Sequence, residues 1–290
     1  MTMQVIQQTM LRPDSPNASR RSPSRLRSVA IALSLAVLTL SGCATTTYTV
    51  DETPVVSESR AKRDLGMDYL SSYRTAMAIR QLEASLELDS KDPQTHLWLG
   101  EAYRRKGQTK KAEEFLTDSI ALSVAQKDKS SEQQARLNLS AMLSQIGRYE
   151  ESLPHCEKLA ADATFSSPWL ALTNCGWALM QLGREDEARD KLREALDYFP
   201  SYSPALLNQG ILEAKQGHRV AAIRAFEGAL EAGRLQRSGR AEANFRLGEI
   251  YVALGHRENA VKHFSASVEN APNVDWATQS QAYLDLIGRR

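Results

Sequence analysis

Small and apolar residues recur every three or four positions along residues 172–200, in two runs separated by Gly183. This spacing predicts two amphipathic helices joined by a tight turn. Gly176 in the first run and Ala188 in the second predict the place where the helices cross closely, and Pro200 ends the second helix. One such hairpin cannot bury its own apolar face, so the pattern predicts a stack of several copies.

The same pattern recurs six times along the chain. Its first small position is filled by Gly66, Gly100, Ser140, Gly176, Gly210 and Gly248, at spacings of 34, 40, 36, 34 and 38 residues. The position where the second helix crosses the first holds Ala78, Ala112, Ser152, Ala188, Ala222 and Ala260. A glycine marks the turn in five copies, and Tyr73 stands there in the first copy. Small residues in register over six copies predict helical hairpins rather than a sheet.

These small residues resemble the tetratricopeptide repeat, and the resemblance covers residues 59–274. It implies an all-α, right-handed superhelical solenoid of six repeats, with the first helix of each repeat lining a concave face. Residues 275–290 carry apolar side chains spaced to face inward, at Trp276, Ala277, Tyr283, Leu284 and Ile287. We expect this segment to form a helix that caps the last repeat.

An uncharged apolar run at residues 28–40 follows an Arg- and Ser-rich start. The run is short for a membrane span but has the length of a signal-peptide core. It ends in Leu40-Ser41-Gly42-Cys43, which resembles the bacterial lipobox; an ordinary signal peptide that happens to precede a cysteine is the alternative. The resemblance implies that residues 1–42 are cleaved and that acyl chains on Cys43 anchor the protein in lipid.

The residue after the lipobox cysteine is Ala44 rather than an aspartate. By resemblance to lipoprotein sorting in double-membraned bacteria, this implies the periplasmic face of the outer membrane. Residues 43–58 then form the lipidated N-terminus and a flexible tether, because they carry Thr, Val and Pro with little pattern.

Composition and candidate chemistry narrow the functional class. The chain holds 36 Lys+Arg against 35 Asp+Glu, a formal charge of +1, which gives no reason to expect nucleic acid as a partner. Its histidines occur singly, at His96, His155, His218, His256 and His263. No zinc-site spacing, Walker loop or catalytic elbow is present. The sequence therefore predicts a binding protein rather than an enzyme, with no cofactor and no metal.

Two cysteines remain besides Cys43. Cys156 falls on the second helix of repeat 3 and Cys175 on the first helix of repeat 4, and these helices are expected to be neighbours. An exported protein can keep a disulfide there. Two buried free thiols that fill small-residue positions between the helices are the alternative.

Certain first-helix positions of each repeat are expected to point into the concave groove. The candidate partner-binding residues are Leu97, Leu137, Leu170, Trp177, Met180, Leu207, Ile211 and Phe245. An apolar stripe of this kind predicts an amphipathic helix or an extended apolar segment as the ligand. The alternative is that these side chains only pack between adjacent first helices.

A lipobox, a short tether and six tetratricopeptide repeats together resemble the type IV pilus pilotin lipoproteins. The more specific resemblance lies in Leu137-Asn138 followed by residues 147–153, in the insertion at residues 160–168, and in Asn174-Cys175-Gly176. Members of that group often carry two cysteines in this pair of repeats. The resemblance implies a role in inserting and multimerising the secretin, the outer-membrane ring of the pilus, with secretin protomers as partners. The alternatives are a periplasmic adaptor for peptidoglycan enzymes and an accessory of the outer-membrane β-barrel assembly machinery.

Overall fold

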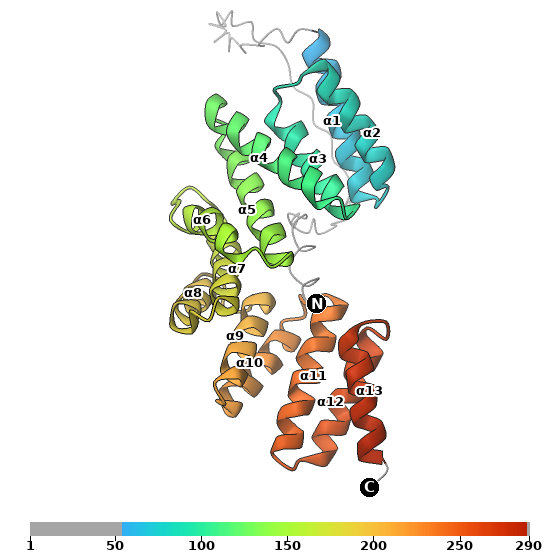
Figure 1. Ribbon diagram of the computed structural model, residues 1–290, viewed down its shortest axis with the longest axis vertical. Helices are drawn as coiled ribbons and strands as arrows, with labels where there is room; N and C mark the ends of the chain where they lie inside the picture. The colour runs from blue at the N-terminus through green and yellow to red at the C-terminus, as the bar shows by residue number, and fades with distance from the viewer. Residues whose placement is uncertain (1–53, 289–290) are drawn as a thin grey trace, which may run out of the picture.

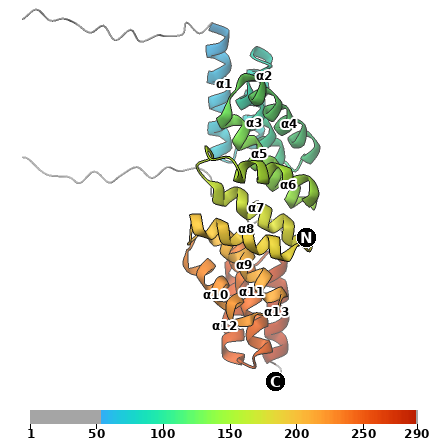
Figure 2. The ribbon, with the colours of Figure 1, turned by 90° about the vertical axis from the view of Figure 1, so that its left-hand side faces the viewer.

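The computed structural model describes residues 54–288, and this part of the chain contains helices and no strands. The helices follow one another along a single elongated stack, with α1 at one end and α13 at the other (Figures 1 and 2). In chain order they are α1 (Pro54–Ser71), α2 (Thr75–Leu88), α3 (Pro93–Arg105), α4 (Thr109–Gln126), α5 (Lys129–Gln145), α6 (Tyr149–Ala160), α7 (Pro168–Gln181), α8 (Glu185–Tyr198), α9 (Ser203–Lys215), α10 (Arg219–Glu231), α11 (Arg237–Ala253), α12 (Arg257–Asn270) and α13 (Asp275–Gly288). This is the superhelical solenoid that the sequence pattern predicts.

Each repeat is a pair of helices that touch where the sequence places its small residues. A Cβ atom added at Gly176 in α7 would lie 2.7 Å from Leu192 Cγ and 3.4 Å from the backbone oxygen of Ala188, both in α8. The contact with Leu192 is shorter than an ordinary carbon–carbon contact, so glycine at this position allows the two helices to approach this closely. The same relation holds in repeats 1, 2, 5 and 6, where a leucine or phenylalanine covers the glycine.

In repeat 3, different residues form the close contact between the two helices. Ser140 replaces the glycine, and the facing position holds Cys156 instead of a leucine or phenylalanine. Because a cysteine side chain is smaller, it leaves room for the hydroxymethyl group of Ser140. Three buried serines extend the polar packing in other repeats: Ser85, Ser119 and Ser267 each donate a 2.8 Å hydrogen bond to the carbonyl oxygen 26 residues earlier, at the first helix of the same repeat.

The turns between the paired helices require a left-handed residue. Gly107, Gly147, Gly183, Gly217 and Gly255 have φ between 75° and 82°. Tyr73, which takes the equivalent place in repeat 1, has φ 59° and a largely exposed side chain. A non-glycine residue in this region carries backbone strain because its Cβ approaches the following carbonyl group.

The first helix begins earlier than the sequence predicts, and the last begins at the predicted residue. α1 begins at Pro54, so its first turn occupies residues that we assigned to the tether, which was expected to extend to residue 58. Pro54 is compatible with a helix start because its missing N–H has no intrahelical partner there, and Glu58 pairs with Lys62 at 3.3 Å. α13 begins at Asp275, where the cap was predicted. The signal peptide, the lipobox and Cys43 lie outside the described residues.

Between residues 54 and 288, no helix combines the length and the apolar character that crossing a bilayer requires.

Candidate partner-binding face and inter-repeat disulfide

Successive first helices contact one another along the solenoid, so α3, α5, α7, α9 and α11 form a continuous inner row. Six of the eight predicted groove residues are buried in the apolar clusters of this row and do not line an open groove. These six are Leu97, Leu137, Trp177, Met180, Leu207 and Phe245. The physical reason is the short distance of about 8–10 Å between packed helices, at which a large apolar side chain fills the space between neighbouring helices. For these six residues, the alternative of packing between repeats is the one that the structure supports.

Leu170 and Ile211 are the two predicted groove residues that remain partly exposed. Both pack against the apolar cluster that contains Trp177 and Met180. Leu170 lies at the start of α7 and Ile211 lies in α9, so the exposed edges belong to adjacent repeats 4 and 5. Direct contact of these two side chains with a partner stays a prediction.

Phe245 is covered by the capping helix. Its ring centroid lies 5.1 Å from that of Trp276 and 6.0 Å from that of Tyr283, both in α13, and 6.0 Å from that of Phe264 in α12. These aromatic contacts account for the burial of Phe245, and they show how α13 closes the apolar end of the last repeat. Ala277, Leu284 and Ile287 also face this interior, as the sequence predicted.

Sequence reasoning missed several polar groups in the inner row, Trp177 and Asn208 among them. Trp177 Nε1 and Asn208 Nδ2 are buried and have no hydrogen-bond partner among the described residues. Asn208 stands two residues before Gly210, and Asn138 and Asn174 stand two residues before Ser140 and Gly176. The recurrence of asparagine two positions before the small residue is visible in the sequence, and it indicates a polar side chain at this place in the inner row.

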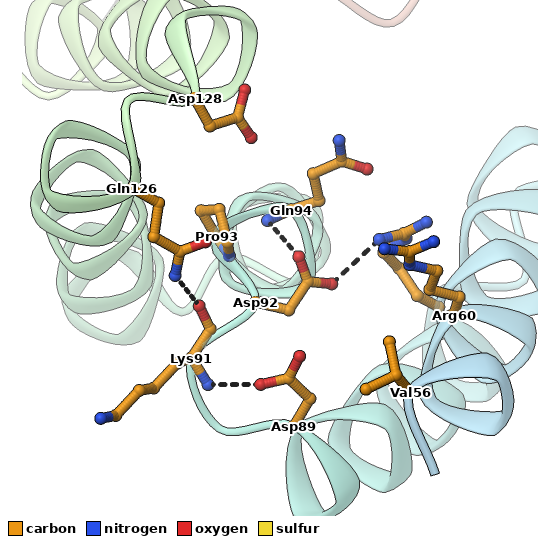
Figure 3. Close-up of a pocket in the computed structure, with 10 residues that line it drawn as sticks. Val56, Arg60, Asp89, Lys91, Asp92, Pro93, Gln94, Gln126 and Asp128 are labelled. Atoms are coloured by element: carbon orange, nitrogen blue, oxygen red, sulfur yellow. Dashed lines mark hydrogen bonds and ion pairs between the residues drawn. The ribbon is translucent and has the colours of Figure 1, made fainter. Parts of the chain in front are cut away.

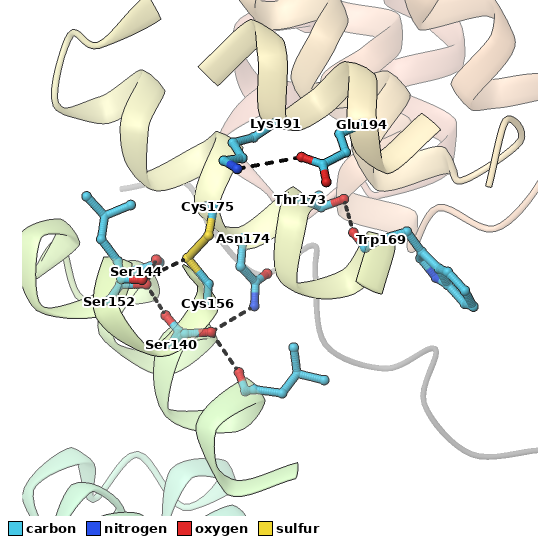
Figure 4. Close-up of a disulfide and its surroundings, with 12 residues drawn as sticks. Ser140, Ser144, Ser152, Cys156, Trp169, Thr173, Asn174, Cys175, Lys191 and Glu194 are labelled. Carbon is cyan, nitrogen blue, oxygen red and sulfur yellow. Dashed lines mark hydrogen bonds and ion pairs between the residues drawn. A yellow bond between two sulfur atoms is a disulfide. The ribbon is translucent and has the colours of Figure 1, made fainter. Parts of the chain in front are cut away.

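The structure joins Cys156 in α6 to Cys175 in α7 by a disulfide (Figure 4), with the two Cα atoms 5.6 Å apart. Both residues are fully buried. Helices α6 and α7 belong to repeats 3 and 4, so the bond links two successive repeats covalently.

A chain of buried hydrogen bonds surrounds the disulfide (Figure 4). Ser144 Oγ donates to Ser152 Oγ at 2.7 Å, and Ser152 Oγ donates to the backbone oxygen of Ser140 at 2.8 Å. Asn174 Nδ2 donates to Ser140 Oγ at 3.1 Å, which brings the next repeat into the same network. Because buried polar groups are stable only when they are paired, this network fixes how repeats 3 and 4 sit against each other.

The insertion at residues 160–168 is held to repeat 3 by ionic contacts. Asp162 pairs with Lys129 at 3.0 Å and accepts a 3.0 Å hydrogen bond from Gln133 and a 2.7 Å hydrogen bond from Thr164 Oγ1. The hydrogen bond from Gln133, followed by those from Thr164 and Lys129, holds the pKa of Asp162 well below its usual range. Because the Lys129 side chain is 52% exposed, we assign its ion pair with Asp162 an orienting role and little stabilisation.

A polar cavity of about 470 Å³ lies between the start of α1, the α2–α3 connection and the end of α4 (Figure 3). Arg63 of α1 pairs with Asp92 at 3.0 Å across it. Asp92 also caps α3 by accepting from the backbone N–H groups of Gln94 and Thr95. Asp128 similarly accepts from the backbone N–H of Ser131 at the start of α5. Asp92 and Asp128, two of the charged residues that line the cavity, therefore hold the starts of α3 and α5.

The histidines are placed by packing and hydrogen bonds. His263 Nδ1 lies 2.9 Å from Asn244 Oδ1, and its ring stacks on Tyr251, which also contacts the ring of His256. Burial lowers the pKa of His155 and of His263, which keeps both neutral near pH 7. Within the described part of the chain, no group of three or more His, Cys, Asp or Glu residues could hold a metal ion.

Family models of the tetratricopeptide repeat match residues 63–125, 169–202 and 207–275, which together make up more than half of the chain. The chain belongs to the tetratricopeptide repeat family. Curated protein sequences provide no match.

Solved structures of other tetratricopeptide repeat solenoids resemble this chain over most of its length. PilW, described as a widely conserved type IV pilus biogenesis factor, has a TM-score of 0.65 and 21% identity, over 76% of this chain and 97% of PilW. PilF of Pseudomonas aeruginosa has a TM-score of 0.65 and 18% identity, over 80% of this chain and 100% of PilF. A chain of the APC/C hetero-tetramer Cut9–Hcn1 has a TM-score of 0.65 and 17% identity, over 82% of this chain and 44% of that chain. At these identities the likeness establishes the fold.

Proposed function

We propose that this tetratricopeptide repeat protein is an outer-membrane lipoprotein that promotes assembly of the type IV pilus secretin. In this proposal the acyl chains on Cys43 hold the protein at the periplasmic face of the outer membrane. The solenoid binds secretin protomers and brings them together for insertion and multimerisation. The protein acts by binding, without catalysis.

The observation that carries the proposal is the extent of the structural match. The solenoid corresponds to 97% of PilW and 100% of PilF, whereas it corresponds to 44% of the Cut9–Hcn1 chain with the same TM-score. A six-repeat solenoid with one cap is therefore similar to essentially the whole of a pilus biogenesis factor. The lipobox-like sequence that ends in Cys43 adds a means of holding such a solenoid at a membrane.

The disulfide between repeats 3 and 4 is also consistent with a role as a scaffold for partner proteins. The disulfide and its hydrogen-bonded serines hold repeats 3 and 4 in one arrangement. A rigid central pair fixes the relative direction of repeats 1–2 and 5–6, so that partners bound at the two ends would meet in a defined geometry.

The test is a deletion of the gene followed by analysis of the secretin on denaturing gels after heating of the samples. We expect the heat-resistant secretin multimer to disappear while monomer remains, and pilus-dependent motility to be lost. A plasmid-borne wild-type copy should restore the multimer, and Cys43→Ala should restore it poorly because the protein no longer concentrates at the membrane. Normal multimers in the deletion strain would refute the proposal.

Partner identity distinguishes the alternatives. Purification of the tagged protein from detergent-solubilised outer membrane should recover secretin. Recovery of peptidoglycan hydrolases or synthases, or of the β-barrel assembly machinery, in place of secretin would favour the corresponding alternative function.

A further inference from the structure

Aromatic and arginine side chains meet at the edge of the solenoid where repeats 4, 5 and 6 join. The ring of Trp169, at the start of α7, packs edge-on against the ring of Phe199, with the ring centroids 5.5 Å apart. The guanidinium carbon of Arg234 lies 5.2 Å from the centroid of the Phe199 ring, and the backbone N–H of Arg234 donates a 3.2 Å hydrogen bond to Ser203 Oγ at the start of α9. These contacts place the starts of α7 and α9 beside the α10–α11 connection. We name this surface the aromatic–arginine edge and define it by Trp169, Tyr198, Phe199, Arg234 and Arg237.

The side chains of the aromatic–arginine edge are accessible to solvent. Trp169 and Phe199 are partly exposed, Tyr198 is 59% exposed, and Arg234 and Arg237 are exposed. Figure 4 shows the Trp169 ring projecting from the start of α7 on the side away from the disulfide. Tryptophan and tyrosine rings of this kind are enriched where a protein meets the interface between a bilayer and water, because each ring has an apolar body and a polar group.

The chain segments that form this edge lack acidic residues. Residues 163–183 and residues 199–212 carry no charged side chain, and residues 232–241 carry three arginines and no acid. Within the described part of the chain, neither Arg234 nor Arg237 forms an ion pair with a carboxylate. The positive charge of the edge is therefore available to an anionic surface outside the protein.

Carboxylates lie at the margins of this edge and in other repeats. Asp197 and Glu231 stand near the ends of α8 and α10, and the three arginines of the α10–α11 connection and the first turn of α11 outnumber them. In repeats 2 and 3, the carboxylates of Asp92 and Asp128 cap the starts of the first helices, whereas the residues that precede α7, α9 and α11 are uncharged. The starts of the first helices are therefore acidic in repeats 2 and 3 and free of acids in repeats 4 to 6.

We propose that the aromatic–arginine edge rests on a bilayer surface that contains anionic phospholipid, with its rings at the level of the headgroups and its arginines beside lipid phosphates. The inference rests on the proposed anchor at Cys43 and adds an orientation of the solenoid to it. The 11 residues from Cys43 to Thr53 span at most roughly 40 Å, so an anchored solenoid stays close to the bilayer and even a weak second contact becomes intramolecular. An acidic protein segment would pair with the arginines but would leave the uncharged rings without a matching surface.

The test attaches the mature protein through the Cys43 thiol to a maleimide phospholipid, so that anchoring does not depend on processing in the cell. The other two cysteines are joined in the disulfide and do not react. The vesicles contain phosphatidylethanolamine and phosphatidylglycerol with brominated acyl chains, which quench tryptophan fluorescence on contact. We expect quenching in the wild-type protein, its loss in Trp169→Phe, and much weaker quenching in vesicles of brominated phosphatidylcholine alone.

Two pairs of arginines supply the matched comparison. Arg234→Gln with Arg237→Gln should lower the ratio of docked to undocked protein by about tenfold to thirtyfold, because each arginine near an anionic surface contributes about fivefold. Arg219→Gln with Arg224→Gln removes the same charge from exposed positions of α10 and should leave the quenching unchanged. Equal effects of the two pairs, or unchanged quenching in Trp169→Phe, would overturn the inference. A Trp169 that lipid does not quench but that responds to hexaglutamate would also overturn it, in favour of an acidic protein segment.

The outcome is independent of the secretin test, because the vesicles contain no secretin. Quenching of Trp169 by lipid, together with normal secretin multimers in the deletion strain, would support the membrane contact and refute the secretin function. Loss of the multimers in that strain, without quenching of Trp169 in the vesicles, would support the function and refute the membrane contact.

Discussion

Substitution of Gly176 by alanine should destabilise the protein, although alanine is the better helix former. The added Cβ would lie 2.7 Å from Leu192 Cγ and 2.8 Å from Leu192 Cδ2, about 1 Å closer than an ordinary carbon contact. Leu192 is fully buried, so it has no free space in which to move. Overpacking of this kind costs about 1–3 kcal/mol, and the gain in helix propensity returns about 1 kcal/mol. We therefore expect a net loss of up to roughly 2 kcal/mol.

A second substitution should reverse the effect. Leu192→Ala alone should cost about 2–5 kcal/mol through the cavity that it creates. In the double variant the new methyl group of Gly176→Ala fills part of that cavity, so the double variant should be more stable than Leu192→Ala alone. Repeat 3 already contains a natural pair of this kind, because Ser140 faces the smaller Cys156.

The measurement is urea unfolding followed by circular dichroism at 222 nm on the mature chain. Gly228→Ala is the matched control, because a Cβ there would lie 3.7 Å from Leu206 Cδ1, an ordinary contact. That variant should gain up to about 1 kcal/mol from helix propensity alone. If Gly176→Ala were as stable as Gly228→Ala, or if its effect simply added to that of Leu192→Ala, the close-approach argument would be wrong.

Three further predictions concern other parts of the solenoid. Reduction of the Cys156–Cys175 disulfide, which closes a loop over a sequence separation of 19, should lower stability by about 3 kcal/mol, and an unchanged urea midpoint in dithiothreitol would contradict this. Burial raises the pKa of Glu242 to about 6, so ionisation of this side chain destabilises the folded protein. The free energy of unfolding should therefore fall by about 2 kcal/mol as the pH rises from 4.5 through 6. Glu242→Gln should remove this part of the pH dependence in thermal unfolding measurements. Tyr73→Gly should raise stability by about 1 kcal/mol because φ is 59° there, and a lower melting temperature would show that the tyrosine ring contributes more than the strain costs.

Much of the fold could be predicted because its determinants are local and repeated. A glycine that faces a leucine or phenylalanine, with an alanine at the crossing, specifies the same hairpin wherever it occurs. The start of α1 was missed because the residues of its first turn are largely exposed and Ser59 is its first buried residue. No apolar period marks a solvent-facing turn, so pattern reasoning finds the first buried position and not the first helical one.

The candidate site was less predictable for a different physical reason. A helical register places Leu97, Trp177 and Phe245 on one face, but the same face can meet a partner or a neighbouring helix. The outcome depends on how closely successive first helices pack, which is a property of the whole stack. The proximity of Cys156 and Cys175 was predictable because it depends on which helices are neighbours, whereas the sequence left the bond itself open beside two buried free thiols. The unpaired state of Asn208 depends on a residue one repeat away, so it emerges only when the repeats are compared in register.

The bond between Cys156 and Cys175 also has a mechanical consequence. A membrane-attached protein bound to a moving assembly would be held at one end and pulled at the other. Under such a force, repeats can unfold from the stack one at a time. The 19-residue separation closed by the disulfide withholds roughly 60 Å of contour length from extension. Stretching the oxidised protein should therefore stop short of the reduced protein by that length, and the centre of the stack should be the last part to lengthen.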